Sequence, residues 1–500
     1  MRLPAFFSRL RKFEFDPTLA DKNRSHFRDD EWTGIRKKVM IQLAAGGVAF
    51  MLWFLVCLCY MYGTLYRSPE RHANLHVLAV DYDGGVVGQA LHAAYAQLKG
   101  PTFFTLEFRS PEEYPAQTDM YQAVWRGDYW ASITAVEGAS ERLSAALQGG
   151  QASAPYNPSD ALHYVWDQQY YPAFANSVIQ SHMSQLIGAT RIAYNKIYGT
   201  QASTIVNTTS TSAVQALLNP IQATGTNIHP TSFGTATFFN TVSMAMPILQ
   251  QFFFLLVLNG VLGAHSLYKK MTVLSSMRLR RLAGLLFTLG AALCQTAYYW
   301  AFREDWQVNG KQFALTWLIL WLLMHIHLLV LDSVSTIAPL PVMPFVVLLW
   351  VLLNISSVLS PLELQAGFYH WGIILPSHEA YSVLVTIWTG GAHDCLYRAL
   401  PILFGWWVLT NVTTSLTHMR ACHLAYKLDR EQSPAIAAQN DVEKAYEADV
   451  DKGKDKESAL DEQNTISRTT TKMTRHPTRE EISLDRREVY GPSIPPFLGR

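Results

Sequence analysis

Long uncharged apolar runs and polar segments alternate along the 500-residue chain. The first run, 39–62, is long enough to cross a hydrocarbon core of roughly 30 Å as a helix. Five further runs follow one polar block, and they cover 236–263, 282–302, 313–331, 342–359 and 399–419. A buried core helix is the alternative for 342–359, the shortest run. The pattern predicts a multispan α-helical membrane protein with six transmembrane helices in a 1+5 arrangement.

The polar block between the first two runs, 63–235, alternates between strand-like and helix-like patterns. Segments rich in β-formers lie at 75–80, 102–108, 129–136 and 161–168. Apolar residues recur at helical spacing between them, and a last long helix is predicted from Pro172 to about Tyr198. We expect segments 207–213 and 219–234 to be loop or extended chain. The block therefore predicts an α/β domain of ordinary size.

Basic residues set the expected orientation. Segment 1–38 ends in Arg36-Lys37-Lys38, and 265–281 holds five Lys or Arg and no acid. The positive-inside rule places both in the cytosol, so the domain 63–235 would be extracytoplasmic and the five-helix domain 236–419 would end inside. The first span has the features of an uncleaved anchor. The tail 427–500 mixes charges with few large apolar residues, which predicts a disordered cytosolic segment.

Charge and cysteine content limit the function further. A net charge of +1 with only 16% charged residues does not favour nucleic acid as a partner. The sequence has no phosphate-binding G-x-x-x-x-G-K-[ST] loop, so any ATP hydrolysis would need a separate ATPase subunit. None of the five cysteines lies in 63–235, and that domain must fold without disulfides. We expect no cofactor and no metal.

The stretch "HVLAVDYDGGVVGQAL" allows two interpretations. Two aspartates one residue apart at a strand end can hold a divalent cation and a nucleotide sugar, as in a transferase. They can also fix the corner of a strand-turn-helix unit, in which glycines make the turn and let the helix pack closely. The candidate ligand-binding and motif residues are Asp81, Asp83, Gly84, Gly85 and Gly88. The block lacks a second acidic cluster with a base nearby, which favours the corner and a protein that is not an enzyme.

Polar groups inside the predicted spans mark a candidate transmembrane path. They are Asn240, Pro247, Gln250, Gln251 and Asn259 in the second span and His325 in the fourth. Amides can hold helices together or line a path for an amphiphile, and Pro247 frees a backbone carbonyl that a neighbour must satisfy. His325 and His327 point about 200° apart on a helix, which favours separate interhelical hydrogen bonds over shared ligation. Asp332 is expected at the membrane interface.

Two further features lie outside the spans. Segment 375–394 predicts a short helix on or dipping into the outer interface, with Glu379 in its first turn, Gly390-Gly391 at its end, and Trp371 and Trp388 at headgroup depth. Asn207-Thr208-Thr209 is an acceptor sequence for N-glycosylation, and an unused sequon is the alternative. The same pattern at Asn354 and Asn411 falls inside predicted spans.

The layout and three motifs resemble a known family. The motifs are "LAVDYDGGVVGQAL", "VWRGDYWASITAVEGASERL" and "ILPSHEAYSVLVTIWTGG". Over 37–426 the chain resembles the fungal nitrosoguanidine-resistance-type membrane proteins, a family with a domain of unknown function, and more distantly the ABC-2-type permease superfamily. The resemblance implies a multi-pass plasma-membrane protein linked to tolerance of drugs or mutagens, through export or lipid organisation.

Two functional hypotheses from different classes follow. The first is a permease-like protein of ABC-2 type that moves or arranges membrane lipids or amphiphilic small molecules, alone, as a homo-oligomer or with a separate ATPase subunit. The second is a non-transporting scaffold or receptor whose extracytoplasmic domain binds a partner. The transferase interpretation of Asp81 and Asp83 is the third.

Overall fold

A computed structural model describes residues 28–149, 156–231 and 234–431. The chain divides into two compact units, 1–59 and 60–500. In the first unit a 3-10 helix, Asp30–Trp32, leads into α3, Thr33–Leu65. This helix of 33 residues is apolar and long enough to span a membrane, in agreement with the predicted first span. The predicted disorder of 427–500 falls largely outside the described residues.

The second unit contains an α/β domain built on a five-stranded sheet with the order β2-β1-β3-β4-β5. The strands are β1 His76–Asp81, β2 Thr105–Arg109, β3 Ala131–Ala135, β4 Leu162–Trp166 and β5 Ala223–Asn227. β1 pairs in parallel with β2 and β3, β4 is antiparallel to β3, and β5 is parallel to β4. Four of the strands match the sequence prediction, whereas β5 lies within 219–234, where loop or extended chain was expected and no sheet strand was predicted.

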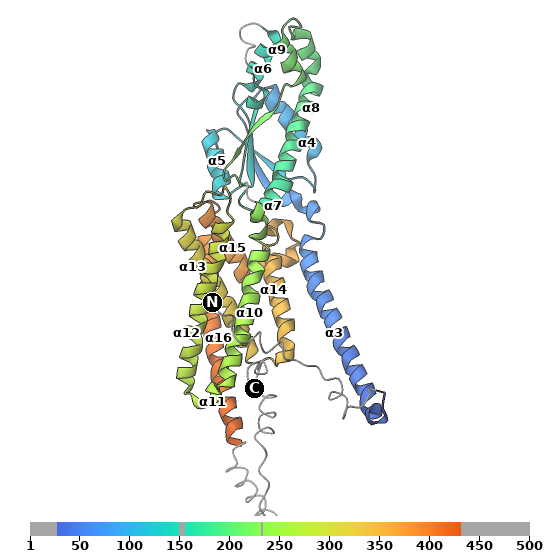
Figure 1. The fold of residues 1–500 in the computed structure, drawn as a ribbon. Helices are drawn as coiled ribbons and strands as arrows, with labels where there is room; N and C mark the ends of the chain where they lie inside the picture. Colours follow the sequence, from blue (N-terminus) through green and yellow to red (C-terminus); the bar gives the residue numbers. More distant parts are fainter. Residues whose placement is uncertain (1–27, 150–155, 232–233, 432–500) are drawn as a thin grey trace, which may run out of the picture. The chain divides into compact units, whose positions relative to one another are not determined.

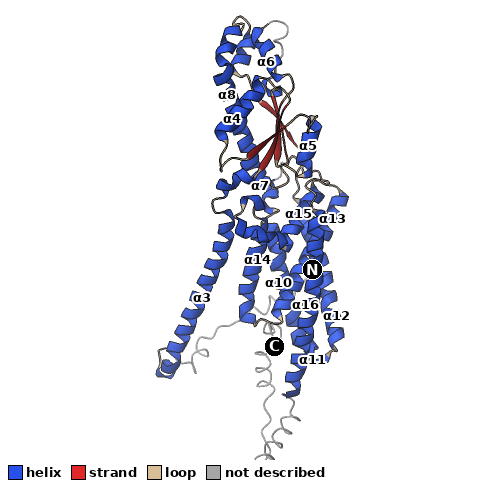
Figure 2. Ribbon diagram, turned by 180° about the vertical axis from the view of Figure 1, so that it is seen from behind, coloured by secondary structure: helices blue, strands red, loops and turns tan. Residues whose placement is uncertain are grey.

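Helices cover both faces of this sheet (Figure 2). The helices of the domain are α4 Val86–Leu98, α5 Gln117–Arg126, α6 Ala139–Gln148, α7 Pro172–Phe174, α8 Ser181–Ile205 and α9 Thr211–Leu218. The predicted helix from Pro172 is interrupted by one π-helical stretch, Ala175–Gln180. α9 begins inside 207–213, so the expected loop or extended chain was wrong for 211–213, and the rest of α9 was not predicted.

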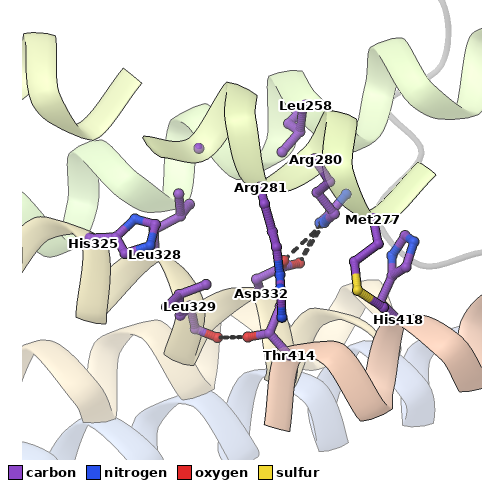
Figure 3. Close-up of a pocket in the computed structure, with 11 residues that line it drawn as sticks. Leu258, Met277, Arg280, Arg281, His325, Leu328, Leu329, Asp332, Thr414 and His418 are labelled. Carbon is purple, nitrogen blue, oxygen red and sulfur yellow. Dashed lines mark hydrogen bonds and ion pairs between the residues drawn. The ribbon is translucent and has the colours of Figure 1, made fainter. Parts of the chain in front are cut away.

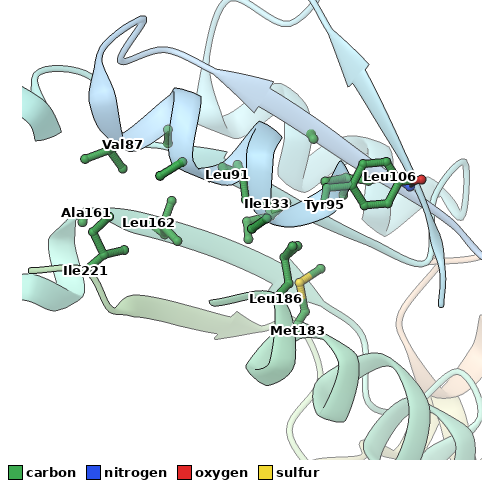
Figure 4. Close-up of a cluster of buried hydrophobic side chains, with 14 of the residues drawn as sticks. Val87, Leu91, Tyr95, Leu106, Ile133, Ala161, Leu162, Met183, Leu186 and Ile221 are labelled. Atoms are coloured by element: carbon green, nitrogen blue, oxygen red, sulfur yellow. Dashed lines mark hydrogen bonds between the residues drawn. The ribbon is translucent and has the colours of Figure 1, made fainter. Parts of the chain in front are cut away.

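The main core of the domain lies between the sheet and α4, α6 and α8 (Figure 4). Val87, Leu91 and Tyr95 repeat at helical spacing along α4 and face Ile133 and Leu186, which are also buried. The opposite face carries a smaller cluster in which Leu78 and Val80 pack on α5. β1 is therefore buried on both faces, which explains why its sequence is an unbroken apolar run.

The described residues from 242 to 431 form a helical bundle (Figure 1). Its helices are α10 Val242–Ala264, α11 Leu267–Lys270, α12 Val273–Ala301, α13 Gly310–Ser335, α14 Met343–Val358, α15 Pro376–Trp388 and α16 Leu396–Glu431. With α3, the described residues contain five helices long and apolar enough to cross a membrane. α14 has only 16 residues and falls short of that length, so a six-span arrangement stays a prediction.

Candidate functional site

The aspartates of the motif after β1 are held by local hydrogen bonds. Asp81 Oδ1 accepts the backbone N–H groups of Asp83 and Gly84, each at 3.0 Å. Asp83 accepts the backbone N–H groups of Gly85 at 3.1 Å and of Ser140, at the start of α6, at 2.8 Å, and it also accepts the Ser140 hydroxyl. Gly84 makes the turn with φ +60°, a region that glycine enters without strain. The two carboxylates thus tie β1 to the beginnings of α4 and α6.

The strand-turn-helix corner that follows β1 has no room for a side chain at Gly85 or Gly88. A Cβ atom on Gly88 would overlap the Asp81 carboxylate, and one on Gly85 would lie 2.6 Å from Cβ of Ser140. Both glycines therefore permit a close approach that no larger residue could make without a shift. Among the described residues, no three His, Cys, Asp or Glu side chains gather where they could hold a metal ion. The geometry supplies a structural role for Asp81 and Asp83.

Two residues of the candidate path, Pro247 and Asn240, lie where a side chain of one helix bonds the backbone of another. Pro247 in α10 has no N–H to give to Ser243 O, and Gln295 Nε2 of α12 donates to that carbonyl at 2.9 Å. Asn240, just before α10, donates to the carbonyls of Val358 and Leu359 at 3.0 and 3.3 Å. These contacts hold helices together, which is one of the two roles expected for polar groups inside the spans.

The two histidines of α13 have separate partners. His327 Nδ1 accepts from Trp350 Nε1 of α14 at 3.1 Å, whereas Thr288 Oγ1 of α12 lies 3.5 Å from His325 Nδ1. The predicted divergence of the two rings is confirmed. The glutamines of α10 diverge as well, since Gln250 is exposed and Gln251 is fully buried. Neither polar atom of the Gln251 amide has a hydrogen-bond partner among the described residues.

A buried ion pair, Arg280 with Asp332, joins α12 to α13 (Figure 3). Arg280 Nε donates to both oxygens of Asp332, at 3.1 and 2.9 Å. Asn259 Oδ1 and the Tyr268 hydroxyl accept its remaining N–H groups at 2.7 and 2.5 Å. Arg280 and Asp332 are 4% and 5% exposed, so both side chains are enclosed by protein. The expected position of Asp332 at the membrane interface stays a prediction.

A small cavity borders this ion pair. Its lining includes Arg280, Asp332, His325 and His418, the last from α16. His418 Nε2 contacts Ser276 Oγ at 3.1 Å, and its buried Nδ1 has no partner among the described residues. The cavity measures about 20 Å³, which is room for a single water molecule. The sequence placed Asn259 and His325 on one path, and the structure brings both to this region.

α15 is enclosed by protein, although the sequence predicts a helix on or dipping into the outer interface. Eleven of its residues are buried, including Glu379, which is fully buried and pairs with Arg398 of α16 at 3.2 Å. Trp388 is 4% exposed and donates to Thr316 Oγ1 at 3.0 Å, so its ring lies in the bundle rather than on its surface. Gly390 and Gly391 have φ of +66° and +113° and turn the chain toward α16.

Asn207 lies between α8 and α9 with its side chain half-buried. Its Oδ1 accepts the backbone N–H of Thr209 at 3.1 Å and the Thr209 hydroxyl at 2.6 Å. We expect Asn207→Gln to lose one glycan in a eukaryotic host, because the predicted topology exposes 63–235 to the glycosylating compartment. Gel mobility before and after glycosidase digestion measures this. Asn354→Gln and Asn411→Gln are the controls and should migrate like the parent, and a parent without glycan would contradict the prediction.

The arrangement defines a class of protein: an integral, multi-pass membrane protein whose helical bundle and α/β domain belong to one chain. Residues 47–412 match the family described as "Protein of unknown function (DUF3533)", and the chain belongs to that family. The matched range includes the whole α/β domain and most of the bundle. Searches of curated proteins and of solved structures gave no match.

Proposed function

We propose that this protein is a permease-like membrane protein of ABC-2 type that exports amphiphilic drugs or mutagens, or redistributes lipids, across the plasma membrane. The single observation that carries the proposal is Gln251, whose amide is fully buried without a partner among the described residues. A buried amide that lacks hydrogen bonds costs about 1–3 kcal/mol. The polar headgroup of a transported amphiphile would form hydrogen bonds with this amide. A purely structural amide would bear the free-energy cost with no compensating contact.

The position of Gln251 supports a path between helices. It lies three residues after Ile248 and four before Leu255, which places all three side chains on one face of α10. Ile248 and Leu255 belong to a buried cluster with residues of α13 and α14. The Arg280–Asp332 pair adds a second buried polar group among apolar helices, and ionisable residues at such depth commonly mark substrate or ion pathways.

The test is Gln251→Leu in the full chain. Leucine removes the unsatisfied amide, so the thermal unfolding midpoint should stay equal or rise. If the amide binds a moving headgroup, efflux of a fluorescent cationic amphiphile or a labelled lipid should fall about tenfold, the effect of one lost hydrogen bond. Gln250→Leu, one residue away on the exposed side, is the matched control and should leave efflux unchanged.

A flux assay also distinguishes the transporter from the scaffold or receptor hypothesis. Vesicles with the purified protein are tested without an energy source, with ATP, and with a proton gradient. Equal flux in protein-containing and empty vesicles under all three conditions would reject a transporter that works alone. The flux would then be measured again after addition of a separate ATPase subunit. If flux in cells is also independent of the protein, the scaffold or receptor hypothesis replaces the proposal.

A further inference from the structure

A buried carboxylate links the α/β domain to the loop that precedes α16. Asp167 follows β4, and its side chain is 1% exposed. Its Oδ2 lies 2.9 Å from His229 Nδ1 and 3.1 Å from His393 Nε2, while its Oδ1 accepts the backbone N–H of Gln169 at 2.9 Å. Asp167 and His229 follow the parallel neighbours β4 and β5, so the sheet brings them to one edge. His393 comes from a segment more than 160 residues farther along the chain.

The backbone and the rings around His393 fit this position closely. His393 has φ +51°, which is uncommon for a residue other than glycine. Its backbone N–H donates to Trp125 O at 3.0 Å, and its ring stacks on Tyr170 with the centroids 4.0 Å apart. A Cβ atom on Gly127 would lie 2.8 Å from His393 Nδ1. α5, the β4–α7 segment and the loop before α16 therefore meet at this imidazole.

The Asp167 carboxylate is the charged group at the centre of this contact. Burial by itself would raise the pKa of the Asp167 carboxyl, but the hydrogen bonds from His229 and His393 outweigh it and lower the pKa well below its usual value. The carboxylate therefore stays ionised through the physiological range, and its contribution to stability is lost only in strong acid. A buried carboxylate needs a cation nearby, and histidine is the side chain that ordinarily gains or loses a proton between pH 5 and 8.

Neutral side chains, ion pairs and two further acids surround the contact. Burial raises the pKa of Tyr170, Tyr381 and Cys395, which keeps all three protonated at neutral pH. The remaining charges form ion pairs, Glu379 with Arg398 at 3.2 Å and Arg126 with Asp128 at 3.0 Å. Glu363 contributes to the raised pKa of Tyr170 and Tyr171, and Asp394 contributes to that of Cys395. Among the described residues, the ion-pair contacts of Asp167 are those with His229 and His393.

We propose that Asp167, His229 and His393 form a proton-binding site that controls how firmly the α/β domain is attached to the loop before α16. With a proton on His393, the contact is an ion pair between the α/β domain and the loop before α16. His229 contacts the same carboxylate from within the domain. Without the proton, a buried carboxylate keeps only neutral N–H donors. The sign follows from the charge: an added proton strengthens the attachment in mild acid, and loss of that proton at higher pH weakens it. This inference does not depend on transport.

Hydrogen exchange of the full chain in lipid nanodiscs tests the site. The backbone amide of His393, which donates to Trp125 O, reports the attachment directly. After correction for intrinsic rates, we expect its protection to fall about tenfold between about pH 6 and about pH 8. His393→Gln and Asp167→Asn should each remove this pH dependence, because neither variant can form the ion pair.

A matched control is His76→Gln, because His76 pairs with Glu107 at 2.6 Å in the same domain but at an exposed position. It should keep the full pH response. The proposal is overturned if the parent protein shows the same protection at both pH values, or if the response persists in His393→Gln and Asp167→Asn. The profile of the parent decides the question even if a variant fails to fold.

Discussion

Replacing Asp332 by alanine should destabilise the bundle by about 3–5 kcal/mol and sharply reduce the yield of folded protein. The substitution leaves the Arg280 guanidinium, which is 4% exposed, without its only carboxylate partner among the described residues. Asn259 and Tyr268 would remain as acceptors, but neither carries the charge that compensates for the loss of water. Thermal unfolding of the protein in mild detergent measures the loss.

The double variant Arg280→Met with Asp332→Leu is the informative control. Removal of both charges eliminates the uncompensated ion, and a well-packed apolar pair can be as stable as the ion pair it replaces. We expect the double variant to recover most of the yield lost in Asp332→Ala. A double variant as unstable as Asp332→Ala would contradict this account, since the loss would then come from packing or hydrogen bonds rather than from charge. Efflux by the stable double variant separately reports whether the pair has a role in transport.

Gly88→Ala is the second change with a large expected effect, about 3 kcal/mol of destabilisation. The added methyl group would overlap the Asp81 carboxylate, which cannot withdraw without losing the N–H groups of Asp83 and Gly84. Overpacking at such a site displaces β1 or α4. Protection of the β1 amides from hydrogen exchange measures the effect in the full chain.

Asp81→Ala separates this steric cause from a chemical role. By itself it should cost about 1–2 kcal/mol through the two lost hydrogen bonds. Combined with Gly88→Ala it should cost less than the sum of the two, because the methyl group then has space. Strict additivity would contradict the overlap. If Asp81→Asn abolished an activity while the β1 amides stayed protected, the transferase hypothesis would gain support.

Much of the architecture could be predicted because its signals are local. The apolar run of β1, the helical spacing in α4 and the length of the spans depend on neighbouring residues. β5 and α9 gave no such signal: β5 reads Ala-Thr-Gly-Thr-Asn and joins the sheet through backbone pairing with β4. Strand formation there depends on a partner about 60 residues earlier in the chain, which a local pattern does not contain.

The ion pair was missed for a geometric reason. The apolar pattern predicts spans that begin at 282 and end at 331, which leaves Arg280 in a basic loop and Asp332 at an interface. α12 begins at Val273 and α13 ends at Ser335, so both helices continue past their apolar runs. This extra length places both charges inside the bundle, where their mutual contact satisfies them. Asp167 and His393 were missed because their separation along the chain hides the contact.

The edge position of β5 has a consequence for biosynthesis. It is the last strand of the sheet in chain order, and only fourteen residues separate its end from the start of α10. The four earlier strands and most of their apolar core precede it, so they can assemble while β5 is still to be made. His229, which follows β5, therefore arrives late, and His393 is made later still. The Asp167 carboxylate gains its two histidine contacts only after both residues are made. Completion of the domain is therefore coupled to synthesis of the membrane helices.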